Sequence, residues 1–578
     1  MEASWWDEVK NSLLSYLGES EGYSLSTMQL SYNNLPDYLK PCLLYMAMFP
    51  EDARIPVSKL ISLWIAEGFV QNIESGRLME EAAEDYLMDL ISSNVVMVSR
   101  RRYNGKVKYC QVHDVVLHFC LEKSREENFM LVVKGQFQPY DWNVSRVSFS
   151  FSDKTSKVSS LGSKTRKFHQ HLRSLIMTYD GGFSNWSKLR LLKVLDLGSH
   201  RMIDFWSATL KPLIHLKYLA VCPDEFHFHP ELHLPHLETL LVKYLFKNTV
   251  VPVIFWKMEK LRHVDISTAV FDLEEDKQRI FEESSKLENL RILKGIDIGD
   301  ADSMDVILQR CPNLEELGIF IKHGCGICPK SVSLTQLQVL HLSFAYTIVV
   351  SELHLPSSLK KLVLKVSHMK SVIPFIGGLP SLEYLQLSEP VHSRDWCLGD
   401  IMLHKLKFLK LVTLGISRWD ASEESFPLLE TLVIKECDDL EEIPPSFADI
   451  PVLKQIKLIG CVNNSLEASA VKIKNEVTDI EGCDRIDITI KDRQGNLKQF
   501  HAHVHPPILS PAKFYQGYTY NSYGLVKFKY QDYLLIDISE DGFVSLLTDS
   551  GNSKDDLRLP TDENLLTRIK DGFTEVTP

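Results

Sequence analysis

Leucines recur at a regular spacing over about half of this 578-residue sequence. Between about residue 170 and residue 460, the pattern Leu-x-x-Leu-x-Leu occurs thirteen times, with other apolar residues in some of the later places. The first leucines of these segments are Leu172, Leu192, Leu216, Leu237, Leu261, Leu290, Leu314, Leu337, Leu359, Leu382, Leu406, Leu429 and Leu453. They span 281 residues in twelve intervals, which gives about 23 residues per repeat.

A repeat of this length is typical of a leucine-rich-repeat solenoid, in which each repeat contributes one short strand. A single repeat cannot bury its own apolar face, so neighbouring repeats share one continuous core. Amphipathic helices are disfavoured, because leucines at i, i+3 and i+5 fit a helical stripe poorly. Gly295 takes the third apolar place in the repeat that begins at Leu290, and we expect a local bend there.

The remaining composition is that of an ordinary multidomain globular protein. Hydrophobic residues make up 44% and charged residues 24%, which excludes wholesale disorder. The formal charge of −12 disfavours a protein that coats nucleic acid generally, although a local basic patch remains possible. The 11 cysteines are an odd number, and no leader or long apolar run is visible. We therefore expect a cytoplasmic protein with reduced thiols.

Residues 1–130 show helical periodicity with breaks at Pro36, Pro50 and Pro56. Their motifs include Leu-Ser-Tyr-Asn-Asn-Leu-Pro at residues 30–36, Phe-Pro-Glu-Asp at 49–52, Leu-Trp-Ile-Ala-Glu-Gly-Phe-Val at 63–70 and Val-His-Asp at 112–114. Followed by the repeats, this order resembles the second ARC subdomain of plant nucleotide-binding leucine-rich-repeat immune receptors, particularly the late-blight resistance group. The resemblance implies a winged-helix domain and a role in plant defence.

In that family, the histidine that matches His113 reaches the phosphate of a bound nucleotide from the winged helix. The sequence contains no Gly-x-x-x-x-Gly-Lys-Ser/Thr loop and no paired acidic metal-binding motif on a strand, which such a site would need. We therefore expect no cofactor, and ADP only if an intact nucleotide-binding domain were present. His113 is then a vestigial nucleotide contact or, equally, a polar residue that ends a buried turn.

A second resemblance lies at the C-terminal end. Residues 533–538 (Tyr-Leu-Leu-Ile-Asp-Ile), 541–547 and 555–560 look like strands of the OB domain of eukaryotic translation initiation factor 5A, and 562–573 resemble its following helix. The chain stops before that domain's closing strand, so we expect an unpaired edge and a marginal fold. The lysine-bearing hypusine loop of that family has no counterpart upstream. We read residues 480–530 in part as a hairpin that caps the last repeat.

These observations predict an α/β chain with an N-terminal helical winged-helix domain, a leucine-rich-repeat solenoid and a C-terminal partial β segment of OB type. The expected bounds are 1–130 for the winged helix, 143–470 for the solenoid, 471–530 for a β-rich cap and 531–578 for the partial OB fold. No catalytic motif is recognisable, so the first interpretation is a disease-resistance-like recognition protein without an intact nucleotide site and not an enzyme. The alternative is a translation factor 5A-like protein that binds ribosome or RNA through its C-terminal domain.

The last six repeats contain the predicted partner site. In each repeat, three alternate residues are expected to face outward on the concave sheet. Among the eighteen such positions that follow Leu337 there are five lysines and no acidic residue, together with two aromatic residues. The predicted partner-binding residues are Lys361, Lys365, Tyr384, Phe408, Lys410, Lys435 and Lys457. The alternative, a solvated lysine-rich face, is equally compatible with the sequence.

The expected partner is an acidic protein, either an effector or a host protein, and no membrane span is expected. Residues 531–578 contain eleven Asp and Glu against four Lys and Arg, a net charge of −7, so this tail is a possible intramolecular occupant of the same strip. Metal binding is not expected. The pair Cys325 and Cys328 lacks a second pair, and the alternating residues His501, His503 and His505 offer only an adventitious site.

Overall fold

The structure is a computed structural model with two compact units, Met1–Lys498 and Gln499–Pro578. It describes residues 28–71, 76–133, 144–149, 171–177, 189–202, 205–243, 248–271, 286–298, 301–322, 335–345, 353–366, 369–388, 395–397, 401–498, 527–528, 531–538, 543–548 and 553–558. The cysteine pair at 325 and 328 and the histidines at 501, 503 and 505 lie outside these residues.

The first unit begins with a small winged-helix domain, as the motifs predict. Its helices and strands are α3 (Lys40–Met46), β1 (Ile55–Pro56), α4 (Val57–Glu67), α5 (Met79–Ser92), β2 (Met97–Arg101), β3 (Val107–Gln111) and α6 (Asp114–Glu126). The three strands form an antiparallel sheet in the order β1-β3-β2. Helix α4 ends at Gly68, whose left-handed φ of 84° is readily adopted by glycine. The hairpin of β2 and β3, here called the wing, extends from the helices.

The solenoid is one long parallel sheet. In chain order its strands are β4 (Leu131–Val133), β5 (Arg146–Phe149), β6 (Ser174–Met177), β7 (Val194–Met202), β8 (Tyr218–Pro223), β9 (Thr239–Val242), β10 (Thr249–Val251), β11 (His263–Phe271), β12 (Ile292–Ile298), β13 (Glu316–Ile321), β14 (Val339–Phe344), β15 (Lys361–Lys365), β16 (Tyr384–Ser388), β18 (Phe408–Val412), β20 (Thr431–Lys435), β21 (Gln455–Ile459) and β22 (Asp487–Lys491). Each main strand pairs in parallel with that of the next repeat, while β10 pairs with the second half of β11.

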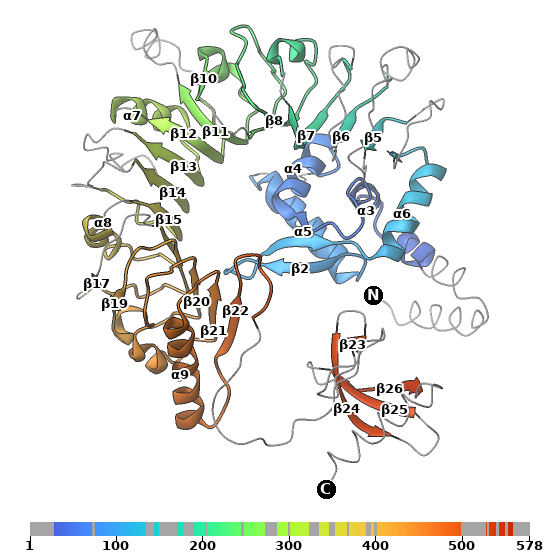
Figure 1. Cartoon of the computed structure of the whole chain (residues 1–578). Coiled ribbons are helices and arrows are strands. Elements are labelled where there is room, and N and C mark those ends of the chain that lie inside the picture. The colour runs from blue at the N-terminus through green and yellow to red at the C-terminus, as the bar shows by residue number, and fades with distance from the viewer. Residues whose placement is uncertain are drawn as a thin grey trace. The chain divides into compact units, whose positions relative to one another are not determined.

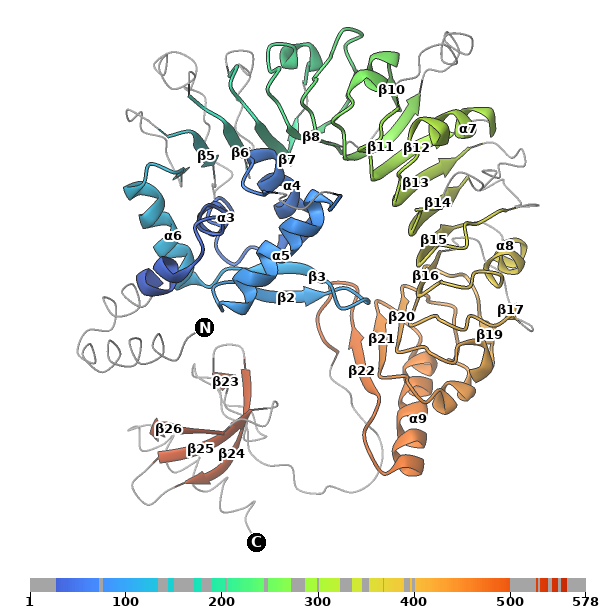
Figure 2. The same ribbon diagram turned by 180° about the vertical axis from the view of Figure 1, so that it is seen from behind.

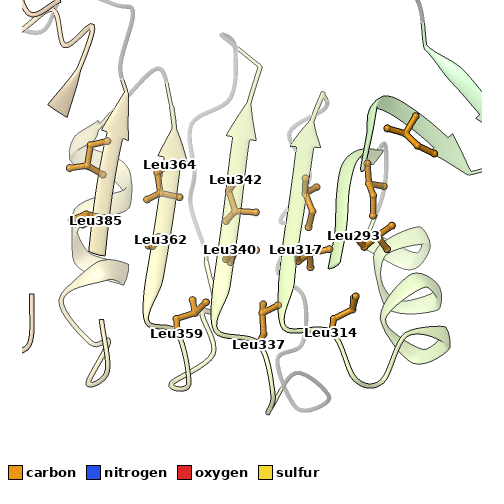
Figure 3. Close-up of a cluster of buried hydrophobic side chains, with 14 of the residues drawn as sticks. Leu293, Leu314, Leu317, Leu337, Leu340, Leu342, Leu359, Leu362, Leu364 and Leu385 are labelled. Atoms are coloured by element: carbon orange, nitrogen blue, oxygen red, sulfur yellow. The ribbon is translucent and has the colours of Figure 1, made fainter. Parts of the chain in front are cut away.

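The leucines of the repeats form the core, as predicted. All thirteen first leucines are at most 1% exposed. Figure 3 shows how the second and third leucines of successive repeats, such as Leu340 and Leu342 or Leu362 and Leu364, lie on one side of neighbouring strands, with Leu337 and Leu359 in the preceding turns. Burying such a side chain contributes about 1.5–3 kcal/mol, and stacking repeats the contribution along the solenoid.

The expected bend at Gly295 is confirmed as an irregularity between β11 and β12. Gly295 has a φ of 78°, and a Cβ at this position would lie 1.5 Å from the carbonyl oxygen of Ile266. The register shifts between Leu293 and Ile296, and the fully buried Ile296 takes the apolar place that Gly295 leaves empty. Only glycine therefore fits here without moving the neighbouring strand.

Helices and short strands lie between the main strands of the repeats (Figure 1). They are η3 (Ser207–Leu210), η4 (Val253–Lys257), α7 (Ala301–Arg310), α8 (Met369–Ile376), β17 (Asp395–Cys397), β19 (Arg418–Asp420), η6 (Glu423–Ser425), η7 (Pro445–Asp449) and α9 (Asn464–Glu481). Helix α9 begins at the cap residue Asn463, whose side chain accepts a hydrogen bond from the backbone N–H of Ser465.

The solenoid continues further than the sequence indicated. Residues 487–491, read as the start of a separate capping hairpin, form β22, which pairs in parallel with β21 as one more strand of the solenoid. The hairpin itself is present only as the turn after β22, with one antiparallel bridge between Lys491 and Leu497. The segment therefore covers the last repeat by adding a strand to the parallel sheet, and its isoleucines enter the same core.

The winged-helix domain packs against the concave side of the first repeats. Both views show its helices inside the arc of strands (Figure 1, Figure 2). Its core includes Ile176, Val194, Tyr218 and Ala220, which are solenoid residues. The domain and the first repeats thus share buried apolar surface and form a single compact unit.

The second unit contains one antiparallel sheet of four strands among its described residues. In order these are β23 (Lys527–Phe528), β24 (Gln531–Ile538), β25 (Phe543–Thr548) and β26 (Ser553–Arg558). The strands at 533–538 and 543–548 are those that the sequence indicated.

Candidate binding surface on the concave sheet

The strand register places one row of side chains along the whole concave face. From β5 to β13 the row consists of Arg146, Ser174, Val194, Tyr218, Thr239, His263, Ile292 and Glu316. From β14 to β22 it continues with Val339, Lys361, Tyr384, Phe408, Thr431, Gln455 and Asp487. The first part of this row is covered by the winged-helix domain, and the second part is more open.

The register brings the predicted partner-binding residues together. Lys361, Tyr384 and Phe408 are neighbours in the first row, and Lys410 lies in the second row two strands from Lys457. Lys365 and Lys435 lie in a third row. All seven are on the concave face, between buried leucines, and they are exposed or partly exposed. We call these seven residues the strip.

Three aromatic rings meet at the centre of the strip. Tyr384 and Phe408 stack with their ring centroids 4.9 Å apart and their planes 11° from parallel. The Lys361 ammonium lies 5.2 Å from the centroid of the Tyr384 ring. The third ring is Tyr103 at the tip of the wing, with centroids 5.0 Å from Tyr384 and 6.4 Å from Phe408. We call this aromatic contact the distal contact.

The wing brings additional positive charge to the strip. Burial lowers the pKa of Lys410, and the charges of Lys435, Lys108 and Arg100 lower it further. The pKa of Lys457 is lowered by burial and by Arg100, although Asp487 acts against this shift. Like charges therefore face each other across this part of the surface.

Lys361 is in a similar environment. Burial lowers its pKa, the carboxylate of Glu316 opposes the shift, and the charges of Lys294, Arg102 and Lys108 add to it. Glu316 itself pairs with Lys294 at 2.9 Å, so its charge is already partly compensated. Burial raises the pKa of the Tyr384 hydroxyl to about 12, which keeps this ring neutral at physiological pH.

A second contact between the winged helix and the repeats, here called the proximal contact, consists of ion pairs and hydrogen bonds where the distal contact is aromatic. Glu67 at the end of α4 is 6% exposed, accepts a hydrogen bond from Arg146 Nε at 3.0 Å and also accepts one from the Ser174 hydroxyl. Lys59 Nζ lies 2.5 Å from a carboxylate oxygen of Asp196, which is 1% exposed.

Two further pairs extend the proximal contact. Arg262 donates two hydrogen bonds to the Glu80 carboxylate, one of them 2.7 Å long. The Ser148 hydroxyl donates a hydrogen bond of 2.6 Å to the backbone oxygen of Met48. Opposite charges and buried apolar residues thus hold α4 and α5 against the first repeats.

His113 lies away from the strip, at the start of α6. Its side chain is exposed, and its Nδ1 accepts a hydrogen bond of 3.3 Å from the backbone N–H of Val115. His113 therefore caps the helix and satisfies one of the free N–H groups of its first turn.

A cavity of about 430 Å³ lies on the winged-helix domain, lined by residues that include Tyr32, Asp37, Lys40, Lys123 and Glu127. Its charges are paired locally. Lys40 lies 2.7 Å from Asp37, and Lys123 lies 3.8 Å from Glu127. Within the described ranges, no group of three or more potential metal ligands is found.

Sequence reasoning missed the wing as part of this surface. Arg100, Arg102 and Lys108 are local in sequence to the winged helix, and no motif connects them to repeats some 260–350 residues later. The cluster of five basic residues within residues 100–108 was the available signal, but it indicates a charged hairpin and not the surface that the hairpin faces. The acidic residue Asp196 in the early repeats has a simple explanation, since it pairs with Lys59.

The comparisons with known proteins agree with this architecture. Residues 48–120 match the family model described as the disease resistance protein winged helix domain. The chain thus combines a winged helix of the disease-resistance class with leucine-rich repeats. Among curated proteins it is similar to a putative late blight resistance protein homologue of Solanum demissum, at 32% identity over 513 residues, which covers 82% of this chain and 37% of that protein.

A late blight resistance protein of the same species is also 32% identical, over 526 residues, and is covered to 38% of its length. The chain therefore spans less than two fifths of the length of these relatives. A solved internalin structure from Listeria monocytogenes has a TM-score of 0.35 at 14% identity, covering 64% of this chain and 88% of that one. The winged-helix family model and the two relatives confirm the resemblance read from the N-terminal motifs.

The C-terminal resemblance is also confirmed. Residues 528–577 match the family model described as the eukaryotic elongation factor 5A hypusine, DNA-binding OB fold. None of the described helices combines the length and the apolar character that a membrane span needs.

Proposed function

We propose that this protein is a recognition protein of the plant disease-resistance class, which binds an acidic protein partner on the strip and acts in the cytoplasm. The observation that carries the proposal is the strip itself. Five lysines and two stacked aromatic rings occupy one concave surface, and no acidic residue stands among the eighteen concave positions of β14–β21. Such a surface complements negative charge and offers flat apolar area for an anchoring side chain.

Similarity over most of the chain supports the disease-resistance class. The alternative, a translation factor 5A-like protein that binds ribosome or RNA, is not favoured, because the corresponding match covers only residues 528–577. Docking of the acidic tail on the strip stays a prediction.

A binding assay with a synthetic acidic peptide tests the proposal. A fluorescently labelled oligoglutamate peptide should bind the full chain at low salt, and the double variant Lys410→Glu/Lys435→Glu should weaken binding by about tenfold or more, as expected from reversing charges at a desolvated surface. The matched control is Lys405→Glu/Lys472→Glu, which reverses two exposed lysines outside the strip. Equal affinities for both double variants would refute the strip as the site.

We also propose that the chain alone is a binding protein without ADP or enzymatic activity. The position of His113 as a helix cap supports this proposal, because the residue already has a structural role. Calorimetry of the full chain with ADP should show no stoichiometric binding, and His113→Ala should lower the free energy of unfolding by about 1 kcal/mol through loss of the cap. Micromolar, stoichiometric ADP binding would contradict the proposal.

A further inference from the structure

The wing presents three cations to the strip, namely Arg100, Arg102 and Lys108, which we call the wing cations. Arg100 and Lys108 lie close enough to Lys410 for their charges to act on it, and Arg102 and Lys108 act in the same way on Lys361. Arg100 also acts on Lys457. Two domains thus contribute positive charge to one place, although their chain segments are far apart in sequence.

This concentration of charge is only partly compensated. Among the described residues, none of the wing cations forms an ion pair with a carboxylate, and the same holds for Lys361, Lys410 and Lys457. The acidic groups whose charges act at this place are Glu316 on Lys361, Asp487 on Lys457 and Glu383 on Tyr103. Of these, Glu316 is already bound by Lys294 and His341.

The wing is nevertheless held against the repeats, and the contact that holds it is aromatic. Tyr103 packs on Tyr384 and Phe408, and the Tyr103 hydroxyl has its pKa raised to about 12 by burial and by the charge of Glu383. Aromatic pairs of this kind contribute only modestly beyond the area they bury. The repulsion between cations on its two sides is offset only in part, by Glu316 at Lys361 and by Asp487 at Lys457.

We propose that the wing is the second wall of the binding surface, so that an acidic segment of the partner protein lies between the wing cations and the lysines of the strip. This inference rests on the proposed function of the strip and adds to it a second domain. An acidic segment placed there supplies the missing negative charge to both walls at once. Its binding then strengthens the distal contact, because the like charges on the two sides no longer repel.

A protein segment fits the surface better than a nucleic acid. Single-stranded nucleic acids bind through bases that stack on free aromatic faces. Here Tyr384 and Phe408 stack on each other, and the Lys361 ammonium and the Tyr103 ring both pack against Tyr384. Carboxylates need no free ring face and pair directly with arginine and lysine.

The first experiment measures binding of the labelled oligoglutamate peptide to the full chain with the triple variant Arg100→Ala/Arg102→Ala/Lys108→Ala. We expect about tenfold weaker binding at low salt, since three charges of one wall are lost. The matched control is Arg101→Ala/Lys106→Ala, which removes wing charges that are engaged elsewhere. Arg101 donates to the Gly105 carbonyl at 2.9 Å, and Lys106 pairs with Glu84 at 2.7 Å.

The outcomes separate this inference from the proposed function. If Lys410→Glu/Lys435→Glu abolishes binding while the triple wing variant binds like its control, the strip acts alone and the second wall is wrong. If neither variant weakens binding, the proposed function itself fails. An oligonucleotide of equal charge that binds more tightly than the peptide, and depends on the same residues, would also overturn the proposal.

Hydrogen exchange provides a readout that does not depend on affinity. Peptide binding should slow exchange of the backbone amides of residues 97–111, because the wing is held more firmly between ligand and repeats. Faster exchange of these amides on binding would mean that the partner displaces the wing, which contradicts the proposed arrangement. The same measurement on residues 79–92 of α5 serves as the internal reference and should not change.

Discussion

The winged-helix domain contacts the repeats in two places that differ in charge and in burial. At the proximal contact, opposite charges pair across a largely buried interface, as in Glu67 with Arg146 and Asp196 with Lys59. At the distal contact, cations lie on both sides and a single tyrosine from the wing packs on two aromatic rings. At the first contact the charges are paired within the chain, whereas at the second no carboxylate of the described residues forms an ion pair with the wing cations.

This difference assigns separate roles to the two halves of the concave face. The proximal half is an internal interface, because its row of side chains is buried under α4 and α5. The distal half keeps its lysines partly exposed, as the proposed partner site requires. A solenoid can divide its functions in this way because each repeat contacts mainly its neighbours, so one segment can be buried without constraining a distant one.

The largest expected effect comes from breaking the proximal contact at Glu67. In Glu67→Ala the Arg146 guanidinium, whose side chain is 12% exposed, stays packed against the rings of Phe69 and Phe129 without its carboxylate. Removing one partner of a buried ion pair costs about 3–5 kcal/mol. Denaturant unfolding of the full chain should show this loss in the first transition, with Glu84→Ala as the exposed control. A loss below about 1 kcal/mol would mean that the pair is effectively solvated.

The next effect is a pH dependence of the proximal contact through His263. This imidazole is partly buried, with its Nε2 inaccessible to solvent, and burial lowers its pKa from 6.5 to about 4, with the charge of Lys294 in the same direction. Because the unfolded chain takes up the proton first, the contribution of neutral His263 to stability is complete above pH 6.5 and is lost as the pH falls towards 4. Linkage gives a loss of about 3 kcal/mol over that range.

The variant His263→Gln tests this assignment, because glutamine cannot be protonated. Denaturant unfolding between pH 7 and pH 4 should show a flatter decline of stability for this variant than for the parent chain. The control His118→Gln replaces an exposed histidine on α6 and should leave the slope unchanged. Parallel declines for His263→Gln and the parent would assign the acid sensitivity to other groups.

The two contacts also differ from the repeats in how well the sequence could predict them. Local patterns predict the fold of the solenoid and the positions of the strip residues, but not either contact. The leucine spacing predicts the solenoid, because burial of Leu-x-x-Leu-x-Leu is a local and repeated requirement. The alternation along each strand likewise placed all seven strip residues on the concave face. The bend at Gly295 could be anticipated for the same reason, since one missing apolar residue interrupts a pattern visible within a single repeat.

Long-range packing was outside the reach of such patterns. Residues 146 and 174 give no sign in the sequence that they meet Glu67, and Tyr103 gives no sign that it meets Tyr384. The strand at 487–491 was assigned to a separate cap because its repeat lacks the leading leucine motif, while α9 supplies Leu466, Ala470 and Ile473 to the core instead. A pairing between distant segments depends on the final curvature of the solenoid, which no local motif encodes.

A smaller effect is expected from removing the ring that forms the distal contact. Tyr103→Ala should lower global stability by about 0.5–1.5 kcal/mol, the contribution of an aromatic pair beyond the area that it buries. The local consequence is larger: exchange of the amides in residues 97–111 should become faster, while the proximal helices α4 and α5 stay protected. Tyr103→Phe is the matched variant and should keep the parent exchange rates. Unchanged exchange in Tyr103→Ala would show that the aromatic contact does not hold the wing.

The smallest effect distinguishes the two contacts by their response to salt. At the distal contact, screening weakens repulsion among the wing cations and the strip lysines, so in the absence of ligand added salt should slow exchange in residues 97–111. The effect should be a few tenths of a kcal/mol, because charges at exposed sites are screened beyond about 8 Å at physiological ionic strength. The proximal pairs are buried and should respond little, so exchange in α4 serves as the reference. In the triple variant of the wing cations the salt effect should disappear. Faster exchange of the wing with increasing salt in the parent chain would mean that attraction, not repulsion, dominates at the distal contact.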